Sequence, residues 1–270
     1  MLLVKNKTLR LLGGALETFS LLSLRLWLKR PHQARSFSGK VFRSYMSLVG
    51  QDKWKCESII DIIPGMKERR IVLDYLPGDG IATPVDELAY LALVTQNLQP
   101  KKIFEIGTFR GRTALNFALN SPAHCRVYTL DLPPGGRDKL SPKVNEADAA
   151  IIRASETGMY YRGKPEESKI EQLYGDSMQF DFTPFASSMD LVFVDGAHHY
   201  ESVLSDTRNA LKMVVEGGCV LWHDFANYGD YNDVTRAVLD LLPPATVVQI
   251  EDTQLAIYKH EPAASSNRAR

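Results

Sequence analysis

The stretch KKIFEIGTFRGRTALNFAL, residues 101–119, decides the fold of this chain. A run of apolar residues that ends at Glu105 is typical of a buried strand, and the pattern switches to helical spacing after Gly111. Gly107 and Gly111 stand four positions apart between them, where a simple turn needs only one glycine. We interpret these glycines as backbone that turns closely against a bound molecule.

Strand and helix patterns alternate from residue 101 onward. Strands are expected at 102–106, 126–131, 170–174, 190–194, 219–223, 246–250 and 255–259, and helices at 83–100, 111–119, 199–214 and 231–242. Apolar strands separated by helices predict a parallel sheet that is covered on both faces. The last two strands lie too close for a helical crossover, so they should pair antiparallel. The predicted fold is α/β: a doubly wound, Rossmann-like, seven-stranded, mostly parallel sheet with an antiparallel last strand.

Three regions are expected along the chain: a helical extension at 1–80, the α/β domain at 81–262 and a disordered tail at 263–270. Leucines and basic residues at 9–30 predict an amphipathic helix, whose uncharged run at 18–24 is too short to span a bilayer. Three readings remain open. This helix packs on its own domain or on a second subunit of a homo-oligomer, contacts a membrane surface peripherally, or belongs to a cleaved organellar transit peptide.

Charge and cysteine content narrow the class of protein. The 270 residues contain 32 Lys plus Arg and 32 Asp plus Glu, so the net charge gives no reason to expect a nucleic acid partner. The three cysteines are far apart in sequence, which argues against a disulfide framework or a zinc site and favours a reducing compartment, the cytoplasm.

Carboxylates follow the expected strands and should face one crevice, because ligands of doubly wound sheets bind beyond the carboxyl ends of the strands. They are Glu105, Asp131, Asp176, Asp195 and Asp224. An acidic crevice disfavours a polyphosphate, and neither a Walker A motif nor G-x-G-x-x-G is present. Such a crevice suits an ammonium or hydroxyl group.

Two stretches carry a resemblance to a known family. FEIGTFRGRTAL resembles the first motif of class I S-adenosylmethionine-dependent methyltransferases, E/D-x-G-x-x-x-G, within an agreement that covers roughly 83–260. The stretch VFVDGAHHYESVLSDTRNALKMVVEGGCVLWHDF resembles a subfamily of small-molecule O-methyltransferases that includes macrocin-type enzymes and cephalosporin hydroxylase-like proteins. The resemblance implies S-adenosylmethionine as the cofactor and a small-molecule or sugar hydroxyl as the methyl acceptor.

The resemblance also implies roles for single residues. Glu105 would hold the amino group of the cofactor, directly or through water, Asp131 its ribose hydroxyls, and Asp176 with Ser177 its adenine edge. The full set of expected cofactor-binding residues is Glu105, Gly107, Thr108, Gly111, Asp131, Asp176, Ser177 and Asp195.

Methyl transfer to a hydroxyl needs a base or a metal that activates the acceptor oxygen. The resemblance extends, more distantly, to catechol-type O-methyltransferases. His198 stands three positions after Asp195, where those enzymes place their base, so His198 and Asp195 are the expected catalytic residues. The alternative is a divalent metal, Mg²⁺ or Mn²⁺, held by Asp195, His223 and Asp224. A structural reading of His198 and His199 is that they cap the helix that follows.

The segment 132–169 is longer than a connection between two strands requires, and its aromatic and basic residues predict a lid or an acceptor-binding element. Two other functions remain open. One is a nicotinamide-dependent oxidoreductase, which would also place an acid after its second strand. The other is a protein that keeps the methyltransferase fold without methyl transfer, as a hydroxylase-like or binding protein.

Overall fold

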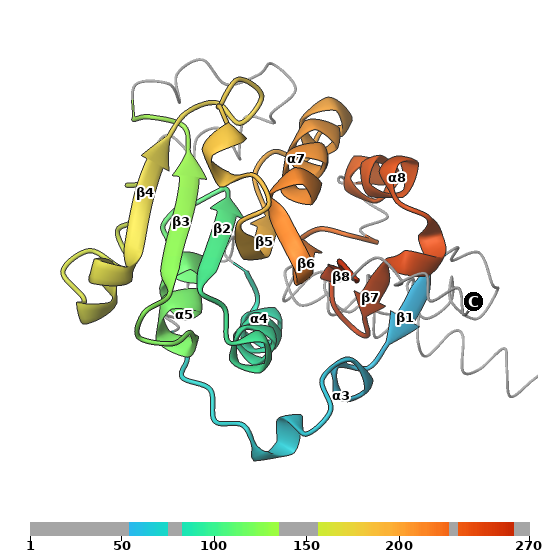
Figure 1. The fold of residues 1–270 in the computed structure, drawn as a ribbon, viewed down its shortest axis with the longest axis horizontal. Helices are drawn as coiled ribbons and strands as arrows, with labels where there is room; N and C mark the ends of the chain where they lie inside the picture. Colours follow the sequence, from blue (N-terminus) through green and yellow to red (C-terminus); the bar gives the residue numbers. More distant parts are fainter. Residues whose placement is uncertain (1–53, 75–82, 135–155, 227–231, 262–270) are drawn as a thin grey trace, which may run out of the picture. The chain divides into compact units, whose positions relative to one another are not determined.

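The computed structural model describes residues 54–74, 83–134, 156–226 and 232–261 (Figure 1). They fall within one compact unit, Lys53–Arg270. None of the helices in these ranges combines the length and apolar character needed to cross a bilayer. The segment 9–30, most of the expected extension and the expected tail lie outside the described residues.

One eight-stranded sheet forms the centre of the fold (Figure 1). In spatial order its strands are β1 (Lys55–Glu57), β7 (Val248–Ile250), β8 (Ala256–Lys259), β6 (Val214–Trp222), β5 (Met189–Val194), β2 (Lys102–Ile106), β3 (Arg126–Asp131) and β4 (Ile170–Tyr174). The run from β6 to β4 is parallel, and β8 is antiparallel to both β6 and β7. The mostly parallel sheet and the antiparallel last strand are therefore confirmed.

The position of β2 determines where a ligand can bind. β2 pairs with β3 on one side and with β5 on the other, so successive strands are added in opposite directions from this point. Helices that leave neighbouring strands toward opposite faces open a crevice at the carboxyl ends of such strands.

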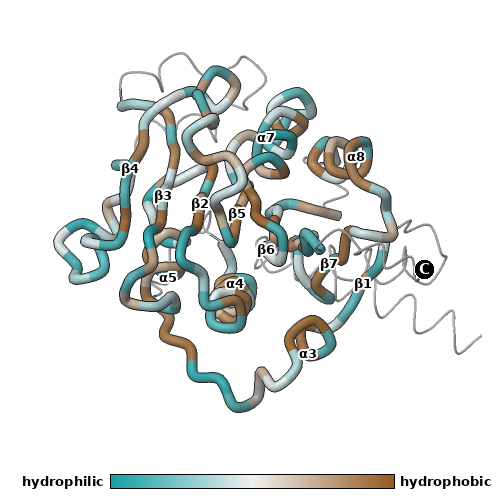
Figure 2. Tube along the Cα trace, viewed as in Figure 1, coloured by the Kyte–Doolittle hydropathy of each residue, from teal (hydrophilic) through white to brown (hydrophobic). Residues whose placement is uncertain are grey.

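Helices cover both faces of the sheet, as the apolar strand patterns predicted. Leu91, Phe117 and Phe193 belong to one buried cluster, to which α3 (Ile59–Ile62), α4 (Val85–Leu98) and α5 (Arg112–Asn120) contribute. Phe104, Val203 and Trp222 belong to the other, with α7 (Tyr200–Met213) and α8 (Asn232–Leu241). Figure 2 shows hydrophobic residues on the central strands and on parts of α3, α4 and α8.

Short 3₁₀ helices complete the described structure. They are η1 (Met66–Glu68), η3 (Pro165–Lys169), η4 (Thr183–Phe185) and η5 (Pro244–Thr246).

The structure corrects three expectations about single elements. The sheet has eight strands, not seven, because Lys55–Glu57 within the expected helical extension pairs in parallel with β7. β6 starts at Val214, before a register shift in its pairing with β5, and not at residue 219. α4 begins at Val85, with Pro84 at its N-cap position, and not at residue 83; the hydroxyl of Thr83 lies 3.4 Å from that of Thr113.

Candidate active site

Four carboxylates lie at the carboxyl ends of neighbouring parallel strands. Glu105 is the fourth residue of β2, Asp131 ends β3, Asp195 directly follows β5, and Asp224 lies just beyond the end of β6. Burial raises the pKa of Glu105 well above its ordinary value, and the negative charges of Asp195 and Asp131 raise it further. The expected convergence of acids is found for these four residues.

The fifth acid, Asp176, lies in a different setting. Its carboxylate is exposed, and its oxygens accept hydrogen bonds from the backbone N–H of Met178 at 2.9 Å and from Gln179 Nε2 at 3.2 Å. Asp176 therefore stabilises its own turn beyond the edge strand β4, as aspartates commonly do. Ser177 beside it is partly buried.

The two glycines give room to protein atoms. A Cβ on Gly107, whose φ is +103°, would collide with the backbone carbonyl of Asp195. A Cβ on Gly111, whose φ is +80°, would lie 2.6 Å from the ring of Tyr161 and 2.9 Å from the Cα of Gly158. Both glycines therefore bring the backbone close to other parts of the protein, and not to a bound molecule as we interpreted them from the sequence.

Asp131 holds the loop between β2 and α5 in place. Its Oδ2 accepts the backbone N–H of Phe109 and its Oδ1 accepts that of Leu132, both at 2.7 Å. Phe109 has a φ of +47°, which is uncommon for a residue with a side chain. Asp131 therefore fixes the backbone of this loop from the end of β3.

His223 joins three carboxylates. Its Nε2 lies 2.8 Å from Glu87 Oε2, and its Nδ1 lies 3.1 Å from Asp224 Oδ2 and 3.3 Å from Asp195 Oδ1. Burial alone would lower the pKa of His223, but these carboxylates outweigh it and raise the pKa well above its ordinary value. Both ring nitrogens act as donors in the protonated ring, so His223 is a buried cation that holds the acids together.

His198 pairs with Asp224. The distance from His198 Nε2 to Asp224 Oδ2 is 3.0 Å, and the exposed fractions of the two side chains are 34% and 9%. Burial opposes the charged form of His198, yet the hydrogen bond and the charge of Asp224 raise its pKa above the ordinary value. Although burial alone would raise the pKa of Asp224, His223 and His198 lower it far below its ordinary range, so its carboxylate is ionised.

Asp224 also has a strained backbone. Its φ is +56°, and the φ of Ala226 is the same. A residue with a side chain keeps a positive φ where contacts with the surrounding structure hold it there, and such residues cluster at functional sites. Here the N–H of Phe225 donates to the carbonyl of Gln254 at 2.9 Å and the N–H of Ala226 donates to Thr235 Oγ1 at 2.8 Å.

Glu87 is a site residue that the sequence analysis missed. It lies in the first turn of α4, is 4% exposed, and accepts the backbone N–H of Gln254 at 2.7 Å through Oε1. The sequence held one signal: Glu87 occupies the buried stripe of α4, four residues before Leu91 and seven before Val94. A carboxylate at a core position implies a buried partner.

The group best placed to hold a metal differs from the expected one. In the described part of the chain, potential ligand atoms of Asp195, His198 and Asp224 all lie within 4.8 Å of one another. The expected set had His223 in place of His198. Because both nitrogens of His223 face carboxylates, neither is available to bind an ion.

The neighbouring histidine, His199, has a structural role. It is the N-cap residue of α7, and its Nε2 lies 2.7 Å from the hydroxyl of Ser202. His199 therefore occupies the N-cap position without a side-chain hydrogen bond to the helix backbone, whereas His198 faces the acids.

Most of the expected lid, 135–155, lies outside the described residues, but its carboxyl end packs on the glycine loop. The N–H of Gly158 donates to Phe109 O at 3.1 Å, and that of Tyr160 donates to Arg110 O at 2.9 Å. The segment 156–163 therefore packs on the glycine loop, and the lid or acceptor-binding role of 132–169 stays a prediction.

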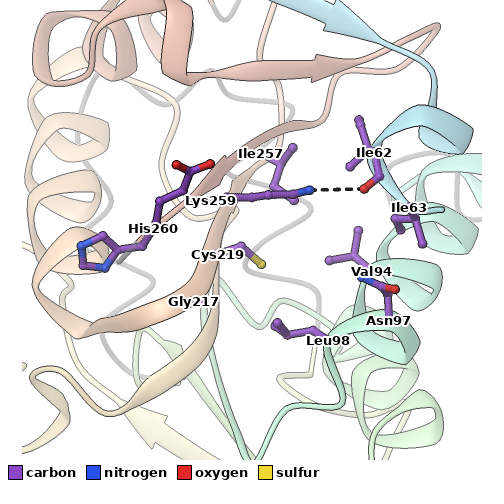
Figure 3. A pocket seen from close by; sticks show the side chains of 12 residues that line it. Ile62, Ile63, Val94, Asn97, Leu98, Gly217, Cys219, Ile257, Lys259 and His260 are labelled. Atoms are coloured by element: carbon purple, nitrogen blue, oxygen red, sulfur yellow. Dashed lines mark hydrogen bonds between the residues drawn. The ribbon is translucent and has the colours of Figure 1, made fainter. Parts of the chain in front are cut away.

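A cavity of about 270 Å³ lies elsewhere in the fold (Figure 3). Its lining includes Ile62, Leu98, Cys219 and Lys259, and the Nζ of Lys259 donates to the carbonyl of Ile62 at 3.3 Å. Cys219 precedes Asp224 by five residues of nearly extended chain, or about 16 Å. This cavity is thus separate from the acids at the strand ends.

Comparison with known proteins shows what the chain is similar to. Residues 104–225 match the model of a family described as a methyltransferase domain, which covers just under half of the chain. Two caffeoyl-CoA O-methyltransferases, from Eucalyptus globulus and Eucalyptus gunnii, are each 24% identical over 155 residues. That overlap is 57% of this chain and 57% and 56% of theirs, so the chain spans little more than half the length of these relatives.

Among solved structures, the O-methyltransferase TomG from Streptomyces achromogenes, in complex with SAM, is similar at 17% identity. The match covers 83% of this chain and 96% of that one, with a TM-score of 0.48. The resemblance to methyltransferases that the sequence motifs indicated is confirmed by the family match.

Proposed function

We propose, from the premise that residues 104–225 are a methyltransferase domain, that this protein transfers a methyl group from S-adenosylmethionine to a hydroxyl of a small molecule or sugar. The observation that carries the proposal is the His198–Asp224 pair, which lies close to Asp195 at the end of β5, on the sheet edge where Glu105 of β2 and Asp131 of β3 also lie. A proton acceptor thus stands at a sheet edge that attracts cations.

The charge of the site supports this cofactor. Glu105, Asp131 and Asp195 place negative charge at adjacent strand ends, and the raised pKa of Glu105 reflects their mutual repulsion as well as burial. S-adenosylmethionine carries an ammonium group and a sulfonium, which would relieve that repulsion. Glu105 is 1% exposed, so we assign it to the ammonium group through one bridging water. Asp131 would hold the ribose, and Ser177 with Asp176 the adenine edge.

His198 has the properties of a base for the acceptor hydroxyl. The ionised carboxylate of Asp224 holds a proton on Nε2, so in the neutral ring Nδ1 carries the lone pair. A histidine held in one tautomer by a carboxylate is a common arrangement for removing a proton from a hydroxyl. The bound cofactor supplies the methyl group, and Asp195 helps to hold His223 and the cofactor.

A metal-independent reaction is the version that the geometry favours. Asp195, His198 and Asp224 would hold a divalent ion, Mg²⁺ or Mn²⁺, which would bind the acceptor oxygen. However, Nδ1 of His223 lies 3.3 Å from Asp195 Oδ1 and 3.1 Å from Asp224 Oδ2, so this ring competes with an ion for the same carboxylates.

Other expectations about this protein stay predictions. They are the helical extension at 1–80 with its membrane, targeting or subunit contacts at 9–30, the homo-oligomer, the domain limits 81–262, the absence of a nucleic acid partner and the cytoplasmic location. The two alternative functions, a nicotinamide-dependent oxidoreductase and a methyltransferase fold without methyl transfer, are outcomes of the tests below.

The first test measures thermal unfolding of the full chain with S-adenosylmethionine, S-adenosylhomocysteine or NAD. Ligands that bind the folded state raise the melting temperature, and we expect this only for the two sulfur nucleosides. Stabilisation by NAD alone would replace the proposal with the oxidoreductase.

A screen of hydroxyl-bearing metabolites with methyl-labelled cofactor, with and without chelator, then tests the reaction. Transfer that persists with chelator supports the version without metal.

A further inference from the structure

A chain of side-chain hydrogen bonds connects Tyr161 to Glu105. The hydroxyl of Tyr161 donates to Gln172 Oε1 at 2.6 Å, and Gln172 Nε2 donates to Thr108 Oγ1 at 3.0 Å. The hydroxyls of Thr108 and Thr129 are 2.7 Å apart, and that of Thr129 donates to Glu105 Oε2. Four of these residues are at most 4% exposed; the fifth, Gln172, is half-buried.

The direction of this chain follows from its donors. Each threonine hydroxyl has one hydrogen. Because Thr129 gives its hydrogen to Glu105, it must accept from Thr108, and Thr108 in turn accepts from Gln172. Every donor thus points toward the carboxylate. Hydrogen bonds in one direction that end on a charge polarise and strengthen one another.

Tyr161 is held firmly at the far end. Its ring lies over Gly111 and its hydroxyl end over Gly158, at positions where a Cβ on either glycine would overlap it. Burial raises the pKa of Tyr161 above its usual range, so the hydroxyl keeps its proton and remains a donor. The absence of side chains at Gly111 and Gly158 therefore allows a tyrosine to reach Gln172.

Glu105 needs hydrogen-bond donors that keep its carboxylate ionised and oriented. It is buried between the charges of Asp131 and Asp195, which oppose its ionisation, while the hydrogen bond from Thr129 favours it. A protonated Glu105 would lose its attraction for an ammonium group. The carboxylate also needs a fixed orientation, because it is nearly closed off from solvent.

We propose that Thr129, Thr108, Gln172 and Tyr161 are positioning residues that keep Glu105 ionised and aimed at the amino group of the cofactor. The inference rests on the proposed function, because it takes an amino acid group on the cofactor as the partner of Glu105. It also assigns a role to residues 156–163, at the carboxyl end of the segment 132–169. They support the glycine loop and thereby affect how tightly the amino acid group of the cofactor is bound.

The test compares two ligands by calorimetric titration of the full chain. S-adenosylhomocysteine and 5′-methylthioadenosine share adenosine and sulfur, but only the first carries an amino acid group. The variants are Thr108→Val, Thr108→Ser and Tyr161→Phe. The matched control is Thr95→Val, which alters a buried threonine of α4 whose hydroxyl donates to Leu91 O. The ratio of the two affinities within one protein does not depend on the fraction that is folded.

Removing one hydroxyl should weaken S-adenosylhomocysteine about 3- to 10-fold in Thr108→Val and Tyr161→Phe, with 5′-methylthioadenosine unchanged. Thr108→Ser should restore the affinity, and Thr95→Val should leave the ratio as in the wild type. Equal losses for both ligands, or no loss, would overturn the positioning role. A wild-type chain that binds neither ligand would overturn the proposed function and this role with it.

Discussion

Glu87 and His223 are 136 positions apart in sequence, yet a contact of 2.8 Å joins Glu87 Oε2 to His223 Nε2. The contact connects the first turn of α4 to the end of β6, and the other oxygen of Glu87 accepts the N–H of Gln254 before β8. Three segments that are distant in the chain therefore meet at one buried carboxylate, and its partner His223 also contacts Asp224, which pairs with the candidate base His198.

Replacing this carboxylate should destabilise the fold. Glu87→Gln keeps an acceptor for the N–H of Gln254 but leaves His223 with one fewer negative partner in a buried place. We expect a loss of about 3 kcal/mol in the free energy of unfolding, measured by urea denaturation at pH 7. Asp86→Asn is the control, since Asp86 is its exposed neighbour and should change stability by less than about 0.5 kcal/mol. A Glu87→Gln protein as stable as the wild type would contradict a buried ion pair.

Asp206 predicts a dependence of stability on pH. It lies in α7 with 0% exposure, and neither carboxylate oxygen has a partner within hydrogen-bond distance. Burial raises its pKa from 3.8 to about 7, although Ser177 lies close enough to oppose the shift in part. The folded state thus binds the proton more tightly than the unfolded chain, so stability should fall as pH rises from about 4 to about 7.

The size of this slope can be measured. The pKa shift of Asp206 corresponds to a loss of up to about 4 kcal/mol in the free energy of unfolding between about pH 4 and about pH 7. Asp206→Asn should remove this pH dependence. Urea denaturation at several pH values gives the two curves. The control is Asp181→Asn, at an exposed carboxyl whose pKa is lowered by hydrogen bonds from Thr183, and it should keep the wild-type slope. An unchanged slope in Asp206→Asn would show that another group titrates.

The two adjacent histidines provide a test of the base. His198→Gln should lower kcat about 10²- to 10⁴-fold for the acceptor found in the screen, because the proton acceptor is lost, while affinity for S-adenosylhomocysteine stays the same. His199→Gln changes only the contact with Ser202 at the start of α7 and should keep kcat within a few fold. If the two variants have equal turnover, His198 does not remove the proton.

The glycine loop predicts a difference between two glycines of similar backbone conformation. Gly111→Ala combines a positive φ with overlap of the Tyr161 ring, whereas Gly163→Ala, at a φ of +74°, meets nothing within 4 Å. We expect a loss of about 1 kcal/mol at Gly163 from backbone strain alone, and about 3 kcal/mol or more at Gly111. Denaturation of both variants measures the difference, and equal losses would mean that the ring of Tyr161 moves aside easily.

Much of the fold was predictable because its signals are local. The strands β2, β3 and β4 were placed with the bounds that the structure has, since each is short and lies between clear turn signals. The eighth strand, Lys55–Glu57, was not predicted. Three residues of mixed polarity have no pattern of their own, and pairing with β7 alone makes them a strand.

The sequence by itself determined the parallel sheet, the order of its acids along the chain and the place of the glycine turn, because strand periodicity and turn chemistry depend on near neighbours. Only the tertiary structure decided which groups act together. It put Glu87 against His223, turned His198 toward Asp224 and His199 toward Ser202, and filled the space over Gly111 with Tyr161. These partners are distant in sequence or depend on one side chain's direction, and long-range packing and charge pairing select them once the chain has folded.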